Sequence, residues 1–397
     1  MNTTPRGERM NICFLGRTNV GKSSLINSLL GQNISIISDL PGTTTDPVLK
    51  RFELHPIGAV TFFDTAGYDD YTELGEKRMI ATMKVLYKSD LAVLVIDHKG
   101  LLDSDKLFIE KLKELNVPFF IISNKSDLAL INEDTKIYLN NKNIDYVSVN
   151  ALNIDEQIIF SNIISKLQSL HKDENSILKD LIKENDQIVL VMPIDSAAPK
   201  GRIILPQVQV IREILDLNAV AICCTGNDIL TTINNLCHPP RMVITDSQII
   251  NNIYNIIPED IPLTTFSVLF ARYRGELNAF INGLCVLKEL KETDHILIAE
   301  ACSHHKTGED IGTVKIPRWL SEYLGFMPNI TKISGSDFPD DLDKYKLVIH
   351  CGGCMLTKIE MIRRINECQR QNVAITNYGI IISEINGVLS RTIKELI

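Results

Sequence analysis

The sequence lacks the features that carry a chain into or across a membrane. No apolar run approaches the ~18 consecutive residues that a membrane-spanning helix needs. The segment from Met1 to Met10 is short and polar, without the hydrophobic region of a secretory signal peptide. We therefore expect a soluble, cytoplasmic protein with no membrane partner.

Blocks of positive charge are also missing. The chain has 41 Lys and Arg against 49 Asp and Glu, a formal net charge of −8 at pH 7, and both signs are spread along it. Because nucleic-acid phosphates are bound by clustered Lys and Arg, we expect no nucleic-acid partner.

The cysteine content argues against a disulfide framework. Nine cysteines, an odd number, occur without a secretory signal, which indicates reduced thiols and metal ligands. Five of them fall in apolar strand or helix patterns, and we expect these to be small core residues: Cys13, Cys223, Cys224, Cys237 and Cys285.

The length and the residue patterns indicate several α/β domains. A chain of 397 residues exceeds one ordinary core, so we expect two or three domains. Strand and helix patterns alternate from residue 10 to about 170, which predicts a mostly parallel sheet with helices on both faces. The expected elements nearest the motifs are strands at Met10 to Leu15, Val60 to Phe63, Pro118 to Ser123 and Asp145 to Val149, and a helix at Ser24 to Leu30.

The first strand runs directly into a phosphate-binding motif, GRTNVGKS, from Gly16 to Ser23. Gly16 and Gly21 let backbone N–H groups wrap phosphates, and the helix starting at Ser24 adds a positive end. Lys22 is placed to reach the β and γ phosphates, and the Ser23 hydroxyl to bind Mg²⁺. The strand-to-helix setting of this motif predicts a nucleotide-binding domain.

Two further segments supply the remaining catalytic groups of a GTPase. Asp64 ends an apolar strand, where it can hold Mg²⁺ through water, and the amide of Gly67 can face the γ-phosphate. The polar loop Pro41 to Asp46 contains Thr44, our candidate for the switch threonine on Mg²⁺. Lys22 completes the predicted catalytic set.

Base selection is expected at the ends of two later strands. Asn124, Lys125 and Asp127 follow one strand, and an Asp carboxylate there accepts two hydrogen bonds from the guanine edge, one more than adenine can donate. Asn150 and Ala151 follow the next strand, where a backbone amide would meet guanine O6. These residues predict GTP as the nucleotide.

Up to this point the chain resembles GTPases of tRNA modification and ribosome assembly, whose motifs read GRxNxGKS and PGTTxD. Many regulatory GTPases place a water-orienting Gln after the position of Gly67, and this chain has Tyr68. The resemblance implies that Asn19 helps to hold a K⁺ ion that supplies positive charge during hydrolysis. The alternative is that Asn19 only caps the loop.

Two separate segments near the end of the chain carry candidate metal ligands. A strand at His295 to Glu300 delivers Cys302 and His304 at its end, after a long helix expected at Ser267 to Leu290. A second strand, Lys346 to Ile349, delivers three more groups before a helix starting near Met355: His350, Cys351 and Cys354. Because ligands gather beyond the carboxyl ends of parallel strands, we expect the two segments to converge.

The metal itself is left open by these residues. Three cysteines and one histidine would satisfy a closed zinc site. Three cysteines alone would hold a [4Fe–4S] cluster with one iron open to His304, His350, His305 or an outside ligand.

The order of the parts is similar to that of the [FeFe]-hydrogenase maturation GTPases, the HydF family. It comprises the GTPase motifs, a small α/β stretch with the loop Asp195 to Arg202, and then the two cysteine segments. The resemblance implies a homodimeric scaffold that receives a di-iron precursor from radical-SAM maturation enzymes and passes it to the apo-[FeFe]-hydrogenase. It also implies that Cys302, Cys351 and Cys354 bind a [4Fe–4S] cluster.

We therefore predict an α/β protein of three domains. These are a GTP-binding domain at 1–172, a dimerisation domain at 180–265 and a cluster-binding domain at 266–397. Two alternatives are kept: a GTPase of tRNA modification or ribosome assembly with a structural zinc site, and a redox sensor whose cluster controls a GTP switch.

Overall fold

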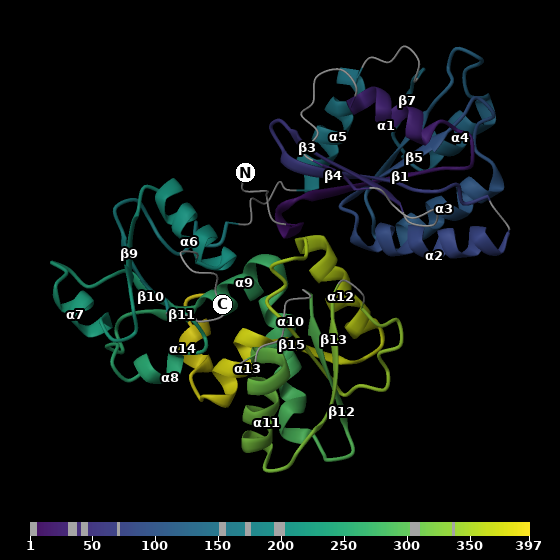
Figure 1. Cartoon of the computed structure of the whole chain (residues 1–397). Coiled ribbons are helices and arrows are strands. Elements are labelled where there is room, and N and C mark those ends of the chain that lie inside the picture. Colours follow the sequence, from purple (N-terminus) through teal and green to yellow (C-terminus); the bar gives the residue numbers. More distant parts are fainter. Residues whose placement is uncertain are drawn as a thin grey trace. The chain divides into compact units, whose positions relative to one another are not determined.

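The computed structural model describes nine stretches of the chain, namely residues 6–30, 38–40, 47–69, 72–150, 156–170, 176–193, 203–301, 310–335 and 338–397. The chain divides into two compact units, Met1–Glu174 and Asn175–Ile397 (Figure 1). Within the described ranges, no helix combines the length and the apolar character needed to cross a bilayer.

The first unit is built on one seven-stranded sheet with the order β2-β3-β4-β1-β5-β6-β7. Strand β3 pairs antiparallel with both β2 and β4, and the other four pairs of neighbours are parallel, which confirms the predicted mostly parallel sheet. Its strands are β1 (Met10–Leu15), β2 (Ser38–Leu40), β3 (Val48–Leu54), β4 (Gly58–Asp64), β5 (Leu91–Ile96), β6 (Phe119–Ser123) and β7 (Tyr146–Ser148). Its helices are α1 (Lys22–Leu30), α2 (Glu73–Lys88), α3 (Asp103–Glu114), α4 (Glu133–Asn141) and α5 (Glu156–Leu170).

Alternate residues of the central strand β1 serve two separate cores. Ile12 and Phe14 belong to the core with apolar residues of α1 and α5. Cys13 and Leu15 belong to the opposite core, with apolar residues of α2, α3 and α4. Because a strand buried on both faces needs apolar residues throughout, β1 reads as a continuous hydrophobic run in the sequence. Figure 1 shows α1 and α5 on one side of the sheet and α2 and α3 on the other.

The second unit contains two four-stranded parallel sheets, with the orders β11-β10-β8-β9 and β13-β12-β14-β15. The elements of the first are β8 (Gln187–Val191), α6 (Leu205–Asp216), β9 (Val220–Cys224), α7 (Ile229–Asn234), β10 (Met242–Thr245), α8 (Ile250–Ile253) and β11 (Leu263–Thr265). The later elements are α9 (Phe266–Arg274), α10 (Leu277–Asn282), η2 (Gly283–Glu289), β12 (His295–Glu300), η3 (Ile311–Lys315), α11 (Ile316–Leu324), β13 (Asn329–Ser334), β14 (Leu347–His350), α12 (Lys358–Arg370), β15 (Ala374–Asn377), α13 (Tyr378–Ile385) and α14 (Leu389–Ile393).

A single hydrophobic core joins these two sheets. It contains Ile188 and Leu190 of β8 together with Leu297 of β12 and Ile349 of β14. Helix α9 contributes several of its residues to this core, including Leu269. The two sheets of this unit are therefore held by shared packing of apolar side chains rather than by a linker alone.

The prediction of a single long helix at Ser267 to Leu290 is wrong. Helix α9 ends at Arg274, Gly275 adopts an extended conformation as its C-cap, and α10 and η2 follow. A Cβ atom at Gly283 would lie only 1.9 Å from the carbonyl oxygen of Ile375 in β15. The chain turns at these glycines because glycine is a poor helix former and because Gly283 packs backbone to backbone against β15.

The expectation that five cysteines lie in the core is only partly right. Cys13 is buried, but Cys223, Cys237 and Cys285 are exposed and Cys224 is half-buried. Strand β9, which carries Cys223 and Cys224, is the edge strand of its sheet, so an apolar run there does not imply burial on both faces.

Candidate functional site

The loop between β1 and α1 follows a path that depends on its glycines. A Cβ atom at Gly16 would lie 2.3 Å from the carbonyl oxygen of Val95, and one at Gly21 would lie 2.3 Å from the side-chain nitrogen of Asn124. Gly21 has a φ of +94°, and Asn19 has a φ of +63° in the left-handed region that asparagine tolerates. The GRTNVGKS motif is therefore seated directly against the ends of β5 and β6.

Lys22 lies at the start of α1 with its ammonium group turned into this loop. Its Nζ donates hydrogen bonds to the carbonyl oxygens of Gly16 (2.8 Å) and Arg17 (2.7 Å). Burial lowers the pKa of Lys22 to about 8, although Asp64 and Asp69 act in the opposite direction. A phosphate chain bound in the loop would raise this pKa again, because a nearby negative charge favours the charged form of a buried ammonium group.

Ser23 and Asp64 meet where the Mg²⁺ of a nucleotide is expected. Burial raises the pKa of the Asp64 carboxyl group, and a hydrogen bond to Ser23 and the charge of Lys22 act against this rise. Oxygen Oδ1 of Asp64 is buried and, among the described residues, has no hydrogen-bond partner. A carboxylate and a hydroxyl are oxygen ligands of the kind Mg²⁺ prefers, so these residues fit that ion. Thr44, the predicted switch threonine, lies outside the described residues.

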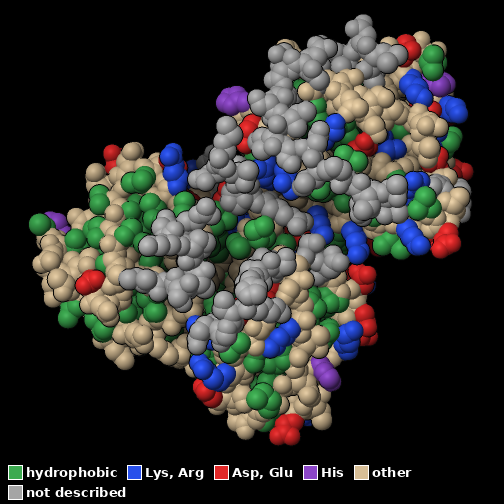
Figure 2. Space-filling view, in the orientation of Figure 1, with side chains coloured by type: hydrophobic (Ala, Val, Ile, Leu, Met, Phe, Trp, Pro, Cys, Tyr) green, Lys and Arg blue, Asp and Glu red, His purple; other side chains and the backbone are tan. Residues whose placement is uncertain are grey.

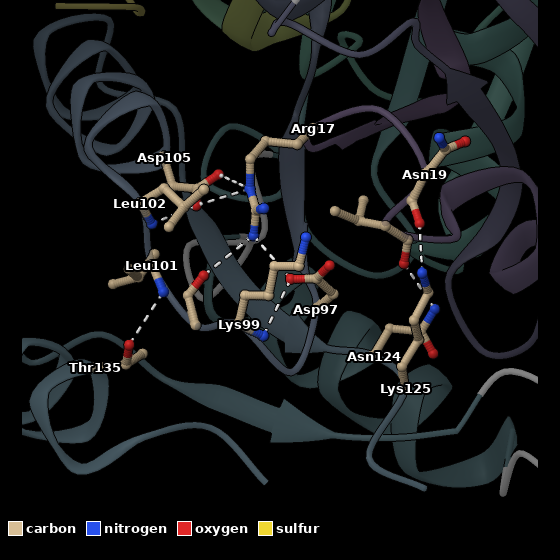
Figure 3. A network of polar contacts seen from close by, with 12 residues as sticks. Arg17, Asn19, Asp97, Lys99, Leu101, Leu102, Asp105, Asn124, Lys125 and Thr135 are labelled. Atoms are coloured by element: carbon tan, nitrogen blue, oxygen red, sulfur yellow. Dashed lines mark hydrogen bonds and ion pairs between the residues drawn. The ribbon is translucent and has the colours of Figure 1, made fainter. Parts of the chain in front are cut away.

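The predicted base-recognition segment also anchors the phosphate loop. Asn124 donates from Nδ2 to the carbonyl oxygen of Val20 (2.9 Å), and Lys125 donates from Nζ to that of Asn19 (2.6 Å). Figure 3 shows both contacts beside Asn19. Asp127 is exposed, so its carboxylate is accessible to a base.

The other described residues that were predicted to contact the nucleotide are Ser24, Asn150 and Gly67. Ser24 is exposed at the start of α1, and Asn150 is half-buried after β7. Gly67 lies against the loop, because a Cβ atom there would lie 2.2 Å from Oγ1 of Thr18. Ala151 lies outside the described residues. The structure thus brings Gly16, Asn19, Lys22 and Asn124 together at one edge of the sheet.

A buried ionic network beside the loop was not predicted from the sequence. Arg17 donates from Nη2 to Asp97 Oδ1 (3.0 Å) and from Nε to both oxygens of Asp105 (3.1 Å each). Tyr68 donates its hydroxyl hydrogen to Asp105, and its ring stacks on Phe108 with the ring centroids 4.1 Å apart. The only hint in the sequence is a cation inside the phosphate motif, since its partners lie 80 and 88 residues away.

In the second unit, strands β12 and β14 are parallel neighbours, with Ala299 opposite His350. The backbone N–H of Ala301, the residue before Cys302, donates to Sγ of Cys351 at 3.2 Å. The ends of the two strands that carry the predicted ligands therefore converge, although Cys302 and His304 themselves lie outside the described residues.

Burial favours the protonated form of both thiols of the second ligand segment, Cys351 and Cys354. Burial raises the pKa of Cys351 to about 11 and also raises that of Cys354, which the nearby Arg274 guanidinium partly opposes. A protonated thiol must lose its proton to bind metal, so metal uptake would release protons here. Arg274 is held in place by a hydrogen bond to the carbonyl oxygen of Leu356 (2.5 Å). In the described part of the chain, no group of three or more His, Cys, Asp or Glu is gathered to hold a metal ion.

His350 is fully buried and both of its ring nitrogens are engaged. Nδ1 lies 2.7 Å from the carbonyl oxygen of Cys351, and Nε2 lies 3.0 Å from Nη1 of Arg364. Arg364 also pairs with Glu360 at 3.2 Å. Burial and the Arg364 charge lower the pKa of His350 to about 3, so the ring is neutral. His350 could bind iron only by giving up one of these contacts.

Curated relatives match the GTPase part of the chain. A tRNA modification GTPase, MnmE, from Mesoplasma florum is 31% identical over 45% of this chain and 36% of its own length. The GTPase Der from Nitratidesulfovibrio vulgaris is 40% identical over 32% of this chain and 27% of its own length. The chain thus spans about a third of the length of these curated relatives. The solved Era structure from Aquifex aeolicus is 20% identical, covers 54% of this chain and 92% of its own, and gives a TM-score of 0.33, too low to carry an argument.

Family models account for both units. Residues 11–125 match the 50S ribosome-binding GTPase model. Residues 177–275 match the hydrogen maturase F dimerization domain, and residues 278–395 match the hydrogen maturase F tetramerization domain. These two models together cover more than half of the chain and nearly all of the second unit. The chain therefore belongs to the hydrogen maturase F family, with a GTPase domain followed by the dimerization and tetramerization domains of that family.

Proposed function

We propose that the first unit binds and hydrolyses GTP. The observation that supports this best is the set of Lys22, Ser23 and Asp64, in which one buried carboxylate oxygen of Asp64 has no partner in the part of the chain that the structure describes. Lys22 would hold the β and γ phosphates, Ser23 and Asp64 would hold Mg²⁺, and the Gly67 amide would face the γ-phosphate. Asp127 would accept hydrogen bonds from the guanine edge.

We further propose that the protein serves as a scaffold in the maturation of [FeFe]-hydrogenase. It would receive the di-iron precursor from radical-SAM maturation enzymes and pass it to the apo-hydrogenase. Family membership supports this role, and so does the hydrogen bond from the backbone N–H of Ala301, the residue before Cys302, to Sγ of Cys351. Cys302, Cys351 and Cys354 would hold a [4Fe–4S] cluster, which supplies an iron centre at which the precursor can dock. GTP hydrolysis would govern the binding or release of partners.

An anaerobic preparation tests the metal part of this proposal. A brown protein with broad absorbance near roughly 400 nm and bound iron would support a cluster of the kind cysteine thiolates hold. A colourless protein with stoichiometric zinc would contradict it. Co-expression with apo-hydrogenase and the radical-SAM enzymes then tests the scaffold role. Hydrogenase activity that does not depend on this chain would contradict that role.

We also propose that the protein assembles as a homodimer through residues 177–275. The family model for this range is a dimerization domain. Three large apolar side chains are exposed on α6 and β9: Val208, Leu215 and Val220. Figure 2 shows apolar side chains gathered over the region where Figure 1 draws these two elements. Because such side chains gain free energy when removed from water, they suit a contact between two copies.

The Asp127→Asn variant should bind GTP more weakly than the wild type by about two orders of magnitude, because an amide presents a donor where the guanine edge also donates. The same variant should gain affinity for xanthosine triphosphate, whose edge carries an acceptor there. Equilibrium binding of both nucleotides measures this. Asp134→Asn is the matched control, since Asp134 is an exposed acid on α4, and its affinities should equal those of the wild type. Unchanged GTP affinity in Asp127→Asn would show that the base site is wrongly assigned.

Hydrolysis should be several-fold faster in K⁺ than in Na⁺ if the Asn19 side chain helps to hold the cation. Asn19 is exposed, and its backbone oxygen is already taken by Lys125, so the side-chain amide is the group to test. Because Asn19 has a φ of +63°, Asn19→Gly removes the amide without strain, whereas Asn19→Ala also strains the backbone. The rate difference between the two salts should disappear in both variants. Equal rates in K⁺ and Na⁺ for the wild type would indicate that Asn19 only caps the loop.

A further inference from the structure

Asp105 lies at the centre of the buried network beside the phosphate loop. Its side chain is fully buried and accepts hydrogen bonds from the Arg17 guanidinium and from the backbone N–H of Leu102 at 2.7 Å (Figure 3). It also accepts a hydrogen bond from the Tyr68 hydroxyl. One carboxylate thus connects the phosphate loop, the segment after Gly67 and the start of α3.

The Arg17 side of this connection is rigid. Besides Asp105, Arg17 binds Asp97 at 3.0 Å and the carbonyl oxygen of Gly100 at 3.1 Å. Asp97 follows β5 directly, and its Oδ1 also accepts from the backbone N–H of Lys99 at 3.2 Å. Buried ion pairs with several hydrogen bonds hold a fixed geometry, because any departure leaves a charge without compensation.

The Tyr68 side is held by two independent contacts with α3. Its hydroxyl donates to Asp105, and its ring stacks on Phe108 at an interplanar angle of 18°. Asp105 and Phe108 are three residues apart on the helix and so project from the same face. Burial and the Asp105 charge raise the pKa of Tyr68, so the hydroxyl remains a donor. In this position Tyr68 points into the core and does not orient a water molecule.

A second link runs in parallel on the surface. The next residue, Asp69, accepts hydrogen bonds from the backbone N–H (2.6 Å) and the hydroxyl (2.7 Å) of Thr18. The consecutive residues Tyr68 and Asp69 are therefore tied to the consecutive residues Arg17 and Thr18 of the phosphate loop. Gly67, which directly precedes them, is pressed against Thr18.

We propose that Asp105 is a positioning residue for recognition of the γ-phosphate. It acts through Arg17 and Tyr68, and it holds the Gly67 amide at the edge of the phosphate loop where the third phosphate of GTP would lie. This inference rests on the proposed GTPase function. It adds that discrimination between GTP and GDP depends on a carboxylate of α3 that touches neither nucleotide nor metal.

The Tyr68→Phe variant of the full chain tests this, because it removes the hydroxyl and keeps the stacked ring. Affinity for a non-hydrolysable GTP analogue and kcat for GTP should each fall by roughly tenfold, the effect of losing a hydrogen bond to a charged group. Affinity for GDP should stay within about twofold, since GDP lacks the phosphate that Gly67 would meet. Tyr138→Phe is the matched control, because Tyr138 lies on α4 and contacts Lys106 through its ring, and it should change none of these values.

The outcomes separate the inference from the proposed function. If the wild type neither binds nor hydrolyses GTP, the proposed function fails. If the wild type does both and Tyr68→Phe weakens GDP and the analogue equally, lowers only the melting temperature, or binds the analogue more tightly, the positioning role is overturned.

A second variant, Asp105→Asn, removes the charge from the centre of the network. It should show the same selective loss, larger than that of Tyr68→Phe. The double variant should lose no more affinity for the GTP analogue and no more kcat than Asp105→Asn alone, because both substitutions disrupt the same hydrogen bond. Additive losses in the double variant would show that Tyr68 and Asp105 act independently and would also overturn the inference.

Discussion

Replacing Lys22 by alanine should lower kcat/KM for GTP by at least about a hundredfold, and hydrolysis should become undetectable in an ordinary phosphate-release assay. The reason is the position of its ammonium group, which lies within the phosphate loop and donates to the carbonyl oxygens of Gly16 and Arg17. Removal of one charged donor aimed at a transferring phosphoryl group typically costs two or three orders of magnitude in rate.

The same variant should keep its melting temperature, which separates lost chemistry from lost folding. Burial disfavours the charged form of Lys22, as its lowered pKa of about 8 indicates, so the folded state gives up no favourable charge when the side chain is removed. Lys111→Ala is the control, because Lys111 forms an exposed ion pair with Glu114 and its loss should leave the rate unchanged. Wild-type hydrolysis in Lys22→Ala would contradict the assignment of the phosphate loop.

Features that depend on residues close together in the sequence could be predicted from it. The bounds of β1 and β12 agree with their apolar runs, because strands of a parallel sheet buried on both faces must be apolar throughout. The phosphate loop is equally local, since its glycines, its lysine and the helix start all lie within a few residues. The convergence of Cys351 with the end of β12 follows from a general property of parallel sheets, whose strands end at one edge.

What could not be predicted depends on partners distant in the sequence. Nothing near Arg17 indicates that its guanidinium binds Asp105, 88 residues away, or that this carboxylate also holds Tyr68. Nothing near His350 indicates that Arg364 of α12 occupies one of its ring nitrogens. The break between α9 and α10 likewise depends on tertiary contacts at glycines, which outweigh an otherwise helical pattern.

Each of the variants Cys302→Ala, Cys351→Ala and Cys354→Ala should lose most of the iron that the wild type takes up on anaerobic reconstitution, and all maturation of a co-expressed hydrogenase. Thiolate ligands bring negative charge to the iron, and few other groups at the end of a strand can replace them as ligands. GTP hydrolysis should survive all three changes, because the phosphate loop belongs to a separate compact unit. Cys237→Ala, at an exposed cysteine outside the two ligand segments, is the control and should keep its full iron content.

The histidine variants extend this test, because both ring nitrogens of His350 already have partners in the structure. His304→Ala should keep the cluster, alter its spectrum and slow transfer, since water or a carboxylate can replace an imidazole on an open iron. His350 is buried between the Cys351 carbonyl oxygen and Arg364, so His350→Ala should keep the iron but lower the melting temperature, and His350→Gln, which retains hydrogen-bonding capacity, should recover part of that loss. Full iron retention in any one cysteine variant would show that the wrong thiol is named. Complete loss of iron in both His350 variants, with folding intact, would make His350 a ligand despite the contacts that occupy its ring.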